Sequence, residues 1–227
     1  MLEIIYRDEY LIAINKPHDL LVHRSPIAAE VEEFAMQILR DQIGAKVYPA
    51  HRIDRKTGGV LLFALDKDTE KLMQQQFMNN QVHKKYLAIV RGHTPDSGEI
   101  DYPLRKENGT LQDAFTAYRT LHHAELHVPL GKHETSRYSL IEAEPTTGRM
   151  HQLRKHFAHI FHPIIGDRTH GCNKQNKLFK EKWEMTTMLL HASQLSFTHP
   201  VTHGPVTINA ALQPKFLAVM SLMGWAI

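Results

Sequence analysis

The sequence has almost no cysteine. Cys172 is the only one among 227 residues, so the chain can form neither an internal disulfide nor a cysteine pair for structural zinc. The N-terminus, MLEIIYRDEY, lacks the basic stretch and long apolar run of a secretory signal. No run of 18 apolar residues that could span a membrane occurs either. We therefore expect a cytoplasmic protein in a reducing compartment, with no membrane partner.

Extremes of composition are also missing. Hydrophobic residues make up 42% and charged residues 22% of the chain, as in an ordinary soluble globular protein. No internal repeat and no low-complexity segment is present, which excludes solenoid and disordered classes. A chain of this length can bury roughly 70 to 75% of its unfolded surface. We expect a single domain over 1–227, built from two subdomains that share one sheet.

The net charge is small but unevenly distributed. The chain carries a formal charge of +3, whereas residues 147–182 contain eight Lys or Arg against two acidic residues. Residues 1–50 show the reverse, with five basic and eight acidic side chains. A local surplus of positive charge suits a polyanionic partner, because each cation that neutralises a phosphate releases counterions. A solvated basic face is the alternative interpretation.

Apolar periodicity and turn residues predict alternating strands and helices without strict βαβ order. Such a pattern favours an α+β fold with a mixed, largely antiparallel sheet flanked by helices. Residues 93–136 contain many turn-forming pieces and are predicted as a variable insertion or hairpin region. The remaining predicted elements are a hairpin over 4–17, a helix over 30–44 that includes Val31 and stops at Gly44, a strand over 59–65, a helix over 66–80, a strand over 84–92, a strand over 137–145, a helix over 148–160 with the apolar stripe Met150, Leu153, Phe157 and Ile160, and strands over 189–200 and 204–210.

The stretch AHRIDRKTGGVLLFAL places one carboxylate, Asp54, among cationic side chains. His51, Arg52, Arg55 and Lys56 surround it in sequence, and nearby positive charge favours the ionised form of a carboxylate. The glycines that follow Thr57 permit a tight turn before an apolar strand fixes the base of the loop. These features predict a platform for one anionic side chain. A surface turn with a screened ion-pair network is the alternative.

Two further segments combine basic and aromatic residues. In TTGRMHQLRKH, Arg149, Arg154 and Lys155 lie at the start of a predicted helix, and Arg154 flanks the apolar stripe, so it could reach a carboxylate. A helix arginine whose stem covers apolar surface is the commoner case. In HKKYLAIVRG, Tyr86 follows two lysines and begins a strand. An aromatic ring beside cations can stack on a nucleobase, although a tyrosine at the start of a strand is more often half-buried by ordinary packing.

Together these motifs resemble the RluA family of RNA pseudouridine synthases. The combination of H-R-[LI]-D-x-x-T-x-G at 51–59 and T-G-R-x-H-Q-[LI]-R at 147–154 is rare outside that family, and the likeness extends to about residue 210 through KKYLAIVRG, FHPIIGDRTHG and LLHASQLSF. Two departures are visible: Gly58 replaces the usual serine of T-S-G, and Asp19 replaces the usual glycine after NKP-x. Neither touches the carboxylate, although the loop conformation could differ.

The resemblance implies an isomerase that converts a specific uridine of RNA to pseudouridine without a cofactor or metal. By motif, Asp54 matches the catalytic aspartate, acting as a nucleophile or as the base that removes a ribose proton. Arg154 matches the arginine that pairs with it, and Tyr86 matches the tyrosine that packs against the target base. Arg52 matches the residue that fills the stack after the uridine leaves. The fold implied is the pseudouridine synthase catalytic fold with a central RNA-binding cleft, over 1–227 as a single catalytic domain. Unlike several relatives, we expect no S4-like RNA-binding domain.

The substrate and the RNA contacts are predicted less directly. The family member that the sequence resembles most acts on tRNA, at uridine 65, and ribosomal RNA is the alternative because most of the family acts there. No protein partner is required by this interpretation. The expected RNA-binding side chains, in addition to Arg52, are His51, Arg149, Lys174, Lys177 and Lys180.

Two other function classes were weighed against the isomerase. The 17 histidines, with His156, His159 and His162 spaced by three, raise the possibility of a metallohydrolase. However, no H-E-x-x-H motif and no obvious completing carboxylate is present. A non-catalytic RNA-binding module would need only the basic segment. The combination of Asp54, Tyr86 and Arg154 argues against it, because a binder has no need of a carboxylate facing phosphates.

Overall fold

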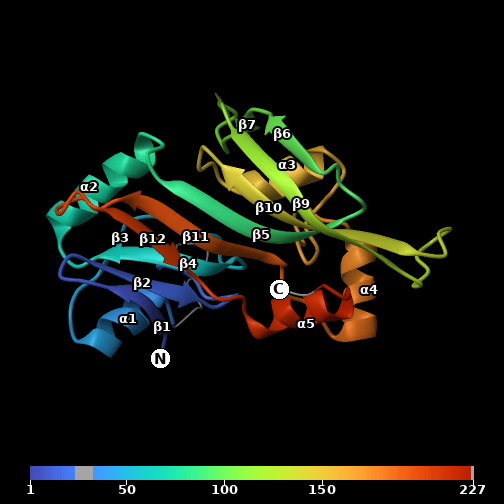
Figure 1. Ribbon diagram of the computed structural model, residues 1–227, viewed down its shortest axis with the longest axis horizontal. Coiled ribbons are helices and arrows are strands. Elements are labelled where there is room, and N and C mark those ends of the chain that lie inside the picture. The colour runs from blue at the N-terminus through green and yellow to red at the C-terminus, as the bar shows by residue number, and fades with distance from the viewer. Residues whose placement is uncertain (24–32, 226–227) are drawn as a thin grey trace. The chain divides into compact units, whose positions relative to one another are not determined.

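The computed structural model describes residues 1–23 and 33–225 (Figure 1). The chain divides into two compact units. The first comprises Met1–Lys84 and Ala192–Ala211, and the second comprises Lys85–His191 and Leu212–Ile227. Within the described residues, no helix combines the length and apolar character needed to cross a membrane.

The first unit is built on a sheet whose strands follow the order β1-β2-β4-β11, with β3 added to β4 and β12 added to β11. The β1–β2, β2–β4, β3–β4 and β11–β12 pairs are antiparallel. In Figure 1 this unit contains the blue to cyan elements together with the red-orange strands β11 and β12. The elements are β1 (Glu3–Arg7), β2 (Leu11–Lys16), α1 (Ala35–Ile43), β3 (Tyr48–Pro49), β4 (Gly58–Ala64), α2 (Lys67–Met78), β11 (Leu190–Thr198), of which Ala192 onward belongs here, and β12 (Pro205–Asn209).

Both faces of this sheet are covered, which explains why β2 and β4 read as continuous apolar runs. Along β2, Leu11 and Ala13 face a cluster that includes Met73 of α2. Ile12 and Ile14 face a second cluster that includes Leu39 of α1. Since side chains alternate across a strand, the two helices pack on opposite faces.

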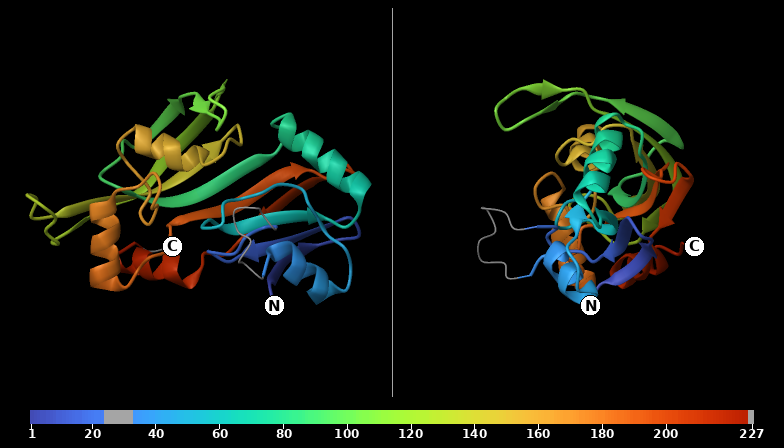
Figure 2. Two further views of the ribbon diagram at one scale, coloured as in Figure 1. Left: turned by 180° about the vertical axis from the view of Figure 1, so that it is seen from behind. Right: turned by 90° about the vertical axis from the view of Figure 1, so that its left-hand side faces the viewer.

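The second unit contains four antiparallel strands in the order β5-β10-β9-β6 and a small separate hairpin, β7–β8. Successive residues of β5 again alternate: Ala88 and Val90 pack with α3, whereas Ile89 packs with α4 and α5. Both figures show α4 and α5 side by side (Figures 1 and 2). The elements are β5 (His83–Arg91), β6 (Ser97–Asp101), β7 (Leu104–Arg105), β8 (Leu111–Gln112), β9 (Phe115–Leu126), β10 (Ser136–Pro145), α3 (Gln152–His159), α4 (Asn173–Trp183) and α5 (Pro214–Leu222).

Local capping explains several boundaries that the sequence predicted. Gly44 ends α1 in the left-handed conformation, with φ of 67°, where glycine carries no Cβ penalty. Asp66 caps α2, because its side chain accepts hydrogen bonds from the backbone N–H groups of Asp68 and Thr69.

The predicted mixed, largely antiparallel fold is confirmed. The structure also confirms, within a residue or two, the hairpin at 4–17 and the strands at 59–65, 84–92, 137–145, 189–200 and 204–210. Residues 93–136, predicted as a variable insertion or a hairpin region, form strands and hairpins.

Two helix predictions were wrong in detail. The first helix starts at Ala35 rather than at residue 30, and part of the predicted range, including Val31, lies outside the described residues. Met150 does not join an apolar stripe: it precedes α3, and its surface is 51% exposed. The reason is that His151 adopts a left-handed φ of 57°, which ends any continuation of α3 toward Met150. Helices α4 and α5 were not predicted.

Candidate active site and RNA contacts

The loop that carries Asp54 is tied to the NKPHDL segment by hydrogen bonds. The Arg55 carbonyl accepts from the Lys16 ammonium at 3.0 Å, and the Lys56 carbonyl accepts from Nδ1 of His18 at 2.7 Å. In the opposite direction, Nε of Arg55 donates to the Asp19 carbonyl at 3.0 Å. Asp54 itself is half-buried, and its carbonyl accepts the Thr57 N–H. The loop is therefore fastened directly after the carboxylate.

Lys16 supports this arrangement from the interior, where lysine side chains are rarely found. Its side chain is fully buried, and its ammonium donates to the carbonyls of Pro17, Leu20 and Arg55 at 2.8, 2.9 and 3.0 Å. Three acceptors match the three donors of a lysine. Burial lowers the pKa of Lys16 to about 7, against the opposing charges of Asp19 and Asp54. Lys16 therefore interacts with the Asp54 carboxylate through its charge and holds the loop of Asp54 by a hydrogen bond to the Arg55 carbonyl.

One of the two departures from the family pattern is explained by backbone geometry. Asp19 has a φ of 66°, which is the left-handed region where glycine is favoured and aspartate is tolerated. It therefore takes the conformation that the usual glycine would take. At Gly59, which follows the pattern, a Cβ would lie 2.1 Å from the Ala192 carbonyl oxygen and φ is 106°, so this glycine permits a close approach to strand β11. Nothing in the structure explains the other departure, Gly58.

His51 is a structural residue rather than a cation beside Asp54. Its Nε2 accepts the Leu62 N–H at 3.1 Å, and its ring stacks on Phe77 with centroids 4.7 Å apart. Burial, together with the charge of Lys84, lowers the pKa of His51 to about 3. The ring is therefore neutral at physiological pH. Positive charge next to Asp54 in the sequence comes from Arg52, Arg55 and Lys56.

Arg154 is buried in the second unit as one half of an ion pair with Asp167. Its Nε and Nη2 donate to Oδ2 and Oδ1 of Asp167, both at 2.8 Å. The two side chains are 7% and 1% exposed. Although burial alone would raise it, the hydrogen bonds and charge of Arg154 hold the pKa of Asp167 below its usual range. A bidentate pair of this kind fixes the plane of the guanidinium.

Further contacts hold Asp167 and connect it to the start of α3. Its Oδ1 accepts the backbone N–H groups of Thr169 and His170 at 2.9 and 3.1 Å. The ring of His170 contacts His151, with Nε2 to Nδ1 at 3.0 Å, and His151 is the residue immediately before α3. Arg154 is therefore held at its head by Asp167 and at the base of its helix by the histidine pair.

Tyr86 lies in β5 opposite Ala143 of β10. It is half-buried and packs against the cluster that contains Leu153 and Phe157 of α3. The same cluster therefore supports the strand of Tyr86 and the helix of Arg154. The structure places these two predicted residues in the second unit and Asp54 in the first.

The predicted basic segment 147–182 does not form one continuous track. Helix α3 packs on one face of β5 and β10, whereas α4 packs on the other. Lys174, Lys177 and Lys180 are exposed on α4, while the half-buried Arg149 precedes α3 and donates from Nε to the Asp113 carbonyl. These are two separate candidate surfaces for RNA.

The histidines spaced by three have individual structural contacts. His156 is buried between the Thr116 hydroxyl and the Tyr102 carbonyl, each at 3.0 Å. His159 stacks on Tyr102, and His162 donates from Nδ1 to the Arg91 carbonyl. Across residues 1–23 and 33–225, no group of three or more His, Cys, Asp or Glu side chains could hold a metal ion.

Sequence reasoning missed Lys16 and Asp167. Both lie in segments that carry the family resemblance, NKP and GDRTHG, but the patterns of charge and periodicity gave no sign that either side chain is buried. Two signals were available in the sequence. Lys16 ends a largely apolar strand, and Asp167 lies between I-I-G and R-T-H.

Comparison with known proteins shows the family of this chain. A sequence model described as RNA pseudouridylate synthase matches residues 10–159. The chain is 47% identical to "tRNA pseudouridine synthase C" of Vibrio cholerae serotype O1, over 99% of this chain and 97% of the relative. It is 47% identical to the protein of the same name from Haemophilus ducreyi, over 99% and 96%. The predicted resemblance to the family member that acts on tRNA is confirmed by these identities.

Two solved human structures share the fold. "Human RNA Pseudouridylate Synthase Domain Containing 4" aligns with a TM-score of 0.74 at 26% identity, over 99% of this chain and 94% of that one. "Human RNA Pseudouridylate Synthase Domain Containing 1" aligns with a TM-score of 0.73 at 23% identity, over 98% and 94%. By motifs, full-length similarity and fold, this chain belongs to the RluA family of RNA pseudouridine synthases and is an isomerase that acts on RNA.

Proposed function

We propose that this enzyme converts one uridine of tRNA, uridine 65, to pseudouridine. The observation that carries the proposal is similarity over 99% of the chain to proteins named tRNA pseudouridine synthase C. This similarity covers nearly the full length of both proteins, which supports a shared substrate class. Ribosomal RNA is the competing substrate, because most of the RluA family acts on it.

The reaction needs one carboxylate and is balanced without redox chemistry. The bond between ribose C1′ and uracil N1 breaks, the base turns, and a bond from C1′ to uracil C5 forms. The proton on C5 leaves and N1 gains one, so the product is an isomer. Asp54 supplies the carboxylate, either as a nucleophile toward the sugar or base or as the base that removes a ribose proton. The tethering of its loop by Lys16 and Arg55 supports this assignment.

Arg154 is the proposed cationic partner of Asp54. Its pair with Asp167 uses two of the five guanidinium N–H donors, which is compatible with a second carboxylate. A guanidinium fixed by Asp167 would favour the ionised form of Asp54 and hold its orientation. Asp167 is then a positioning residue that acts through Arg154.

Tyr86 is proposed to pack against the target base and to remove the final proton from C5. Its half-buried position on the cluster shared with α3 supports a fixed ring that keeps one exposed edge. Because the reacting bond is inaccessible inside a helix, the uridine must be flipped out at a cost of a few kcal/mol. Arg52, which is exposed, is proposed to fill the vacated stack.

RNA is proposed to bind in a central cleft, with contacts from Arg149 and from Lys174, Lys177 and Lys180 on α4. His51 was predicted in the same set. Its neutral ring and its bond to Leu62 favour a role in holding the loop instead.

The test is to map pseudouridine in total RNA from cells with and without the gene. The proposal predicts that pseudouridine disappears from position 65 of tRNA and is restored by the wild-type gene but not by an Asp54→Asn copy. Loss of a ribosomal RNA pseudouridine, with tRNA position 65 unchanged, would assign the enzyme to ribosomal RNA instead.

A further inference from the structure

A pocket of about 400 Å³ lies in the second unit, where the β7–β8 hairpin meets the segment that precedes α3. Its walls come from Leu104 to Asn108 and Gln112 on the hairpin side and from Arg149 and Met150 on the other. Pockets of this size accommodate a small ligand group such as one nucleotide. The residues of the hairpin had no assigned role in the reaction described above.

Backbone hydrogen bonds define both walls of the pocket. The hairpin turn is closed by Lys106 N–H to the Thr110 carbonyl at 2.9 Å and by Gly109 N–H to the Lys106 carbonyl at 3.0 Å. On the other wall, the Arg149 N–H donates to the side chain of Gln152 at 3.0 Å. Gln152 is buried and donates in turn to Phe115 at the start of β9. The hairpin wall is therefore closed by its own bonds, and the Arg149 wall is anchored to β9.

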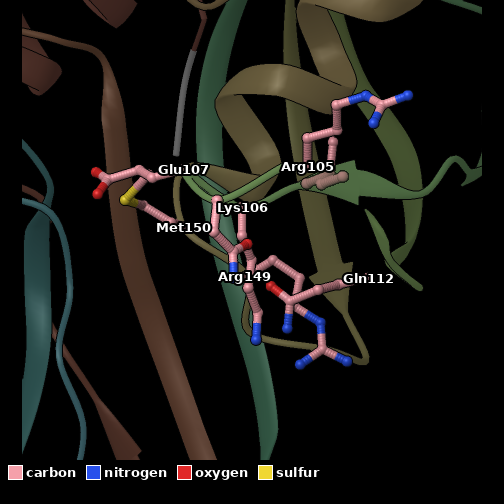
Figure 3. A pocket seen from close by; sticks show the side chains of 8 residues that line it. Arg105, Lys106, Glu107, Gln112, Arg149 and Met150 are labelled. Carbon is pink, nitrogen blue, oxygen red and sulfur yellow. The ribbon is translucent and has the colours of Figure 1, made fainter. Parts of the chain in front are cut away.

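The polar groups of the pocket are sorted by charge. Figure 3 shows the side chains of Lys106, Arg149 and Gln112 extending to one side, whereas Glu107 and Met150 lie at the other. The guanidinium of Arg105 points away from both groups (Figure 3) and donates to the Gly109 carbonyl at 3.0 Å. Two cations and an amide therefore gather at one side, and the carboxylate of Glu107 is separated from them.

Arg149 is held in an orientation that suits an anion. Its Nε donates to the Asp113 carbonyl at 2.9 Å, which directs the two terminal nitrogens toward the side of the pocket where Lys106 lies. A guanidinium presents paired donors that match phosphate oxygens, and a lysine adds a mobile point charge. Exposed Met150 and buried Leu104 supply apolar surface next to these donors.

We propose that this pocket binds a phosphodiester group of the RNA substrate, with Lys106 and Arg149 as the paired cations and Gln112 as an additional donor. The proposal rests on the enzyme's action on RNA and adds a second anchoring point, away from the target uridine. It gives the β7–β8 hairpin a function: the hairpin carries Lys106 to the phosphate that Arg149 contacts from the other wall.

The test measures binding of unmodified tRNA over a salt series by wild type, Lys106→Gln, Arg149→Gln and the double variant. Each single substitution should weaken binding by about tenfold and reduce the log-log salt slope by nearly one unit. Because both cations contact one phosphate, the second substitution should cost less than the first. Lys106 is exposed, so its replacement should not disturb folding, which thermal unfolding would verify.

Lys132→Gln is the control, since it removes one positive charge from an exposed side chain of the same unit that does not line the pocket. It should leave the affinity and the salt slope close to wild type. Equal losses for Lys132→Gln and Lys106→Gln would reduce the effect to a general positive field and overturn the proposal. So would unchanged binding by the Lys106 and Arg149 variants.

A competition arm separates RNA from other phosphates. Inorganic phosphate and uridine monophosphate, at constant ionic strength, should not displace tRNA at low millimolar concentration. Displacement by either would assign the pocket to a free anion or nucleotide. Tritium release from C5-labelled tRNA distinguishes the two levels of proposal: the double variant should raise KM with kcat retained. An inactive wild type would count against the proposed tRNA substrate, whereas an active double variant with unchanged KM would remove only the pocket.

Discussion

Replacing Asp167 with Asn should both destabilise the protein and slow the reaction. The substitution preserves shape and still allows one oxygen to accept the N–H groups of Thr169 and His170. It leaves the Arg154 guanidinium buried without its counter-charge, at 7% exposure. Breaking a buried pair in this way costs about 3 to 5 kcal/mol. For a chain of this length, that corresponds to a fall in Tm of about 6 to 20 °C.

Urea and thermal unfolding would measure the stability loss, and single-turnover kinetics on tRNA would measure the chemical step. Arg154→Met should abolish most activity while the fold is retained, because its apolar stem is kept. The double variant with both Asp167→Asn and Arg154→Met should lose less unfolding free energy than the two single variants lose together, since no unpaired buried charge remains. Glu181→Gln is the control: it breaks the exposed Lys177–Glu181 pair at 3.7 Å and should cost no more than about 0.5 kcal/mol.

Acidification provides a sign test of the same pair. The pKa of Asp167 is held below its unfolded value, so its contribution is present above about pH 4 and is lost as pH falls through the folded pKa. The stability difference between wild type and Asp167→Asn should therefore shrink below about pH 4. Single and double variants whose losses simply add, or an Asp167→Asn protein within about 0.5 kcal/mol of wild type, would refute the reasoning.

Two further predictions concern charge. Burial lowers the pKa of Lys16 to about 7, so between about pH 7 and 10.5 the folded protein binds fewer protons than the unfolded chain. The unfolding free energy of wild type relative to Lys16→Met should consequently rise with pH across that window, by at most about 1.4 kcal/mol per unit; a flat difference in urea titrations would contradict the assignment. Replacing Lys174, Lys177 and Lys180 with Gln should weaken tRNA binding and reduce the salt slope by nearly one unit per lost contact. Replacing Lys67 and Lys71 of α2 with Gln should leave tRNA binding and the salt slope unchanged. If both sets of variants weaken binding equally, the lysines of α4 form only a solvated surface and not an RNA contact.

The sequence predicted those parts of the fold that depend on local patterns. The apolar run over 59–65 became β4, because a strand buried on both faces needs apolar residues at every position. The stop at Gly44 was predictable, since it depends on one residue's backbone preference. The prediction that Met150 belongs to the apolar stripe of α3 was wrong. His151 has a left-handed conformation and contacts His170, nineteen residues away, and no local pattern indicates either feature.

The candidate site divides in the same way. Asp54, Tyr86 and Arg154 were predicted from motifs, but the side chains that support their surroundings were not predicted. Lys16 looked like the polar end of a strand, and its burial depends on carbonyls from Pro17, Leu20 and Arg55 that only the folded loops bring together. The predicted basic track was divided because α3 and α4, adjacent in sequence, pack on opposite faces of the same strands. Charge counted along the chain does not reveal which face it occupies.

The central claim is that Asp54 performs the isomerisation, and tritium release from uracil-C5-labelled tRNA tests it most directly. Wild type, wild type with excess EDTA, and Asp54→Asn would be assayed in parallel with filter binding of each protein. We expect full release by wild type with and without chelator, and none by Asp54→Asn, which preserves size but removes the charge. The variant should bind unmodified tRNA at least as tightly as wild type, because a negative charge near the phosphates has been lost. Substantial release by Asp54→Asn would contradict the account.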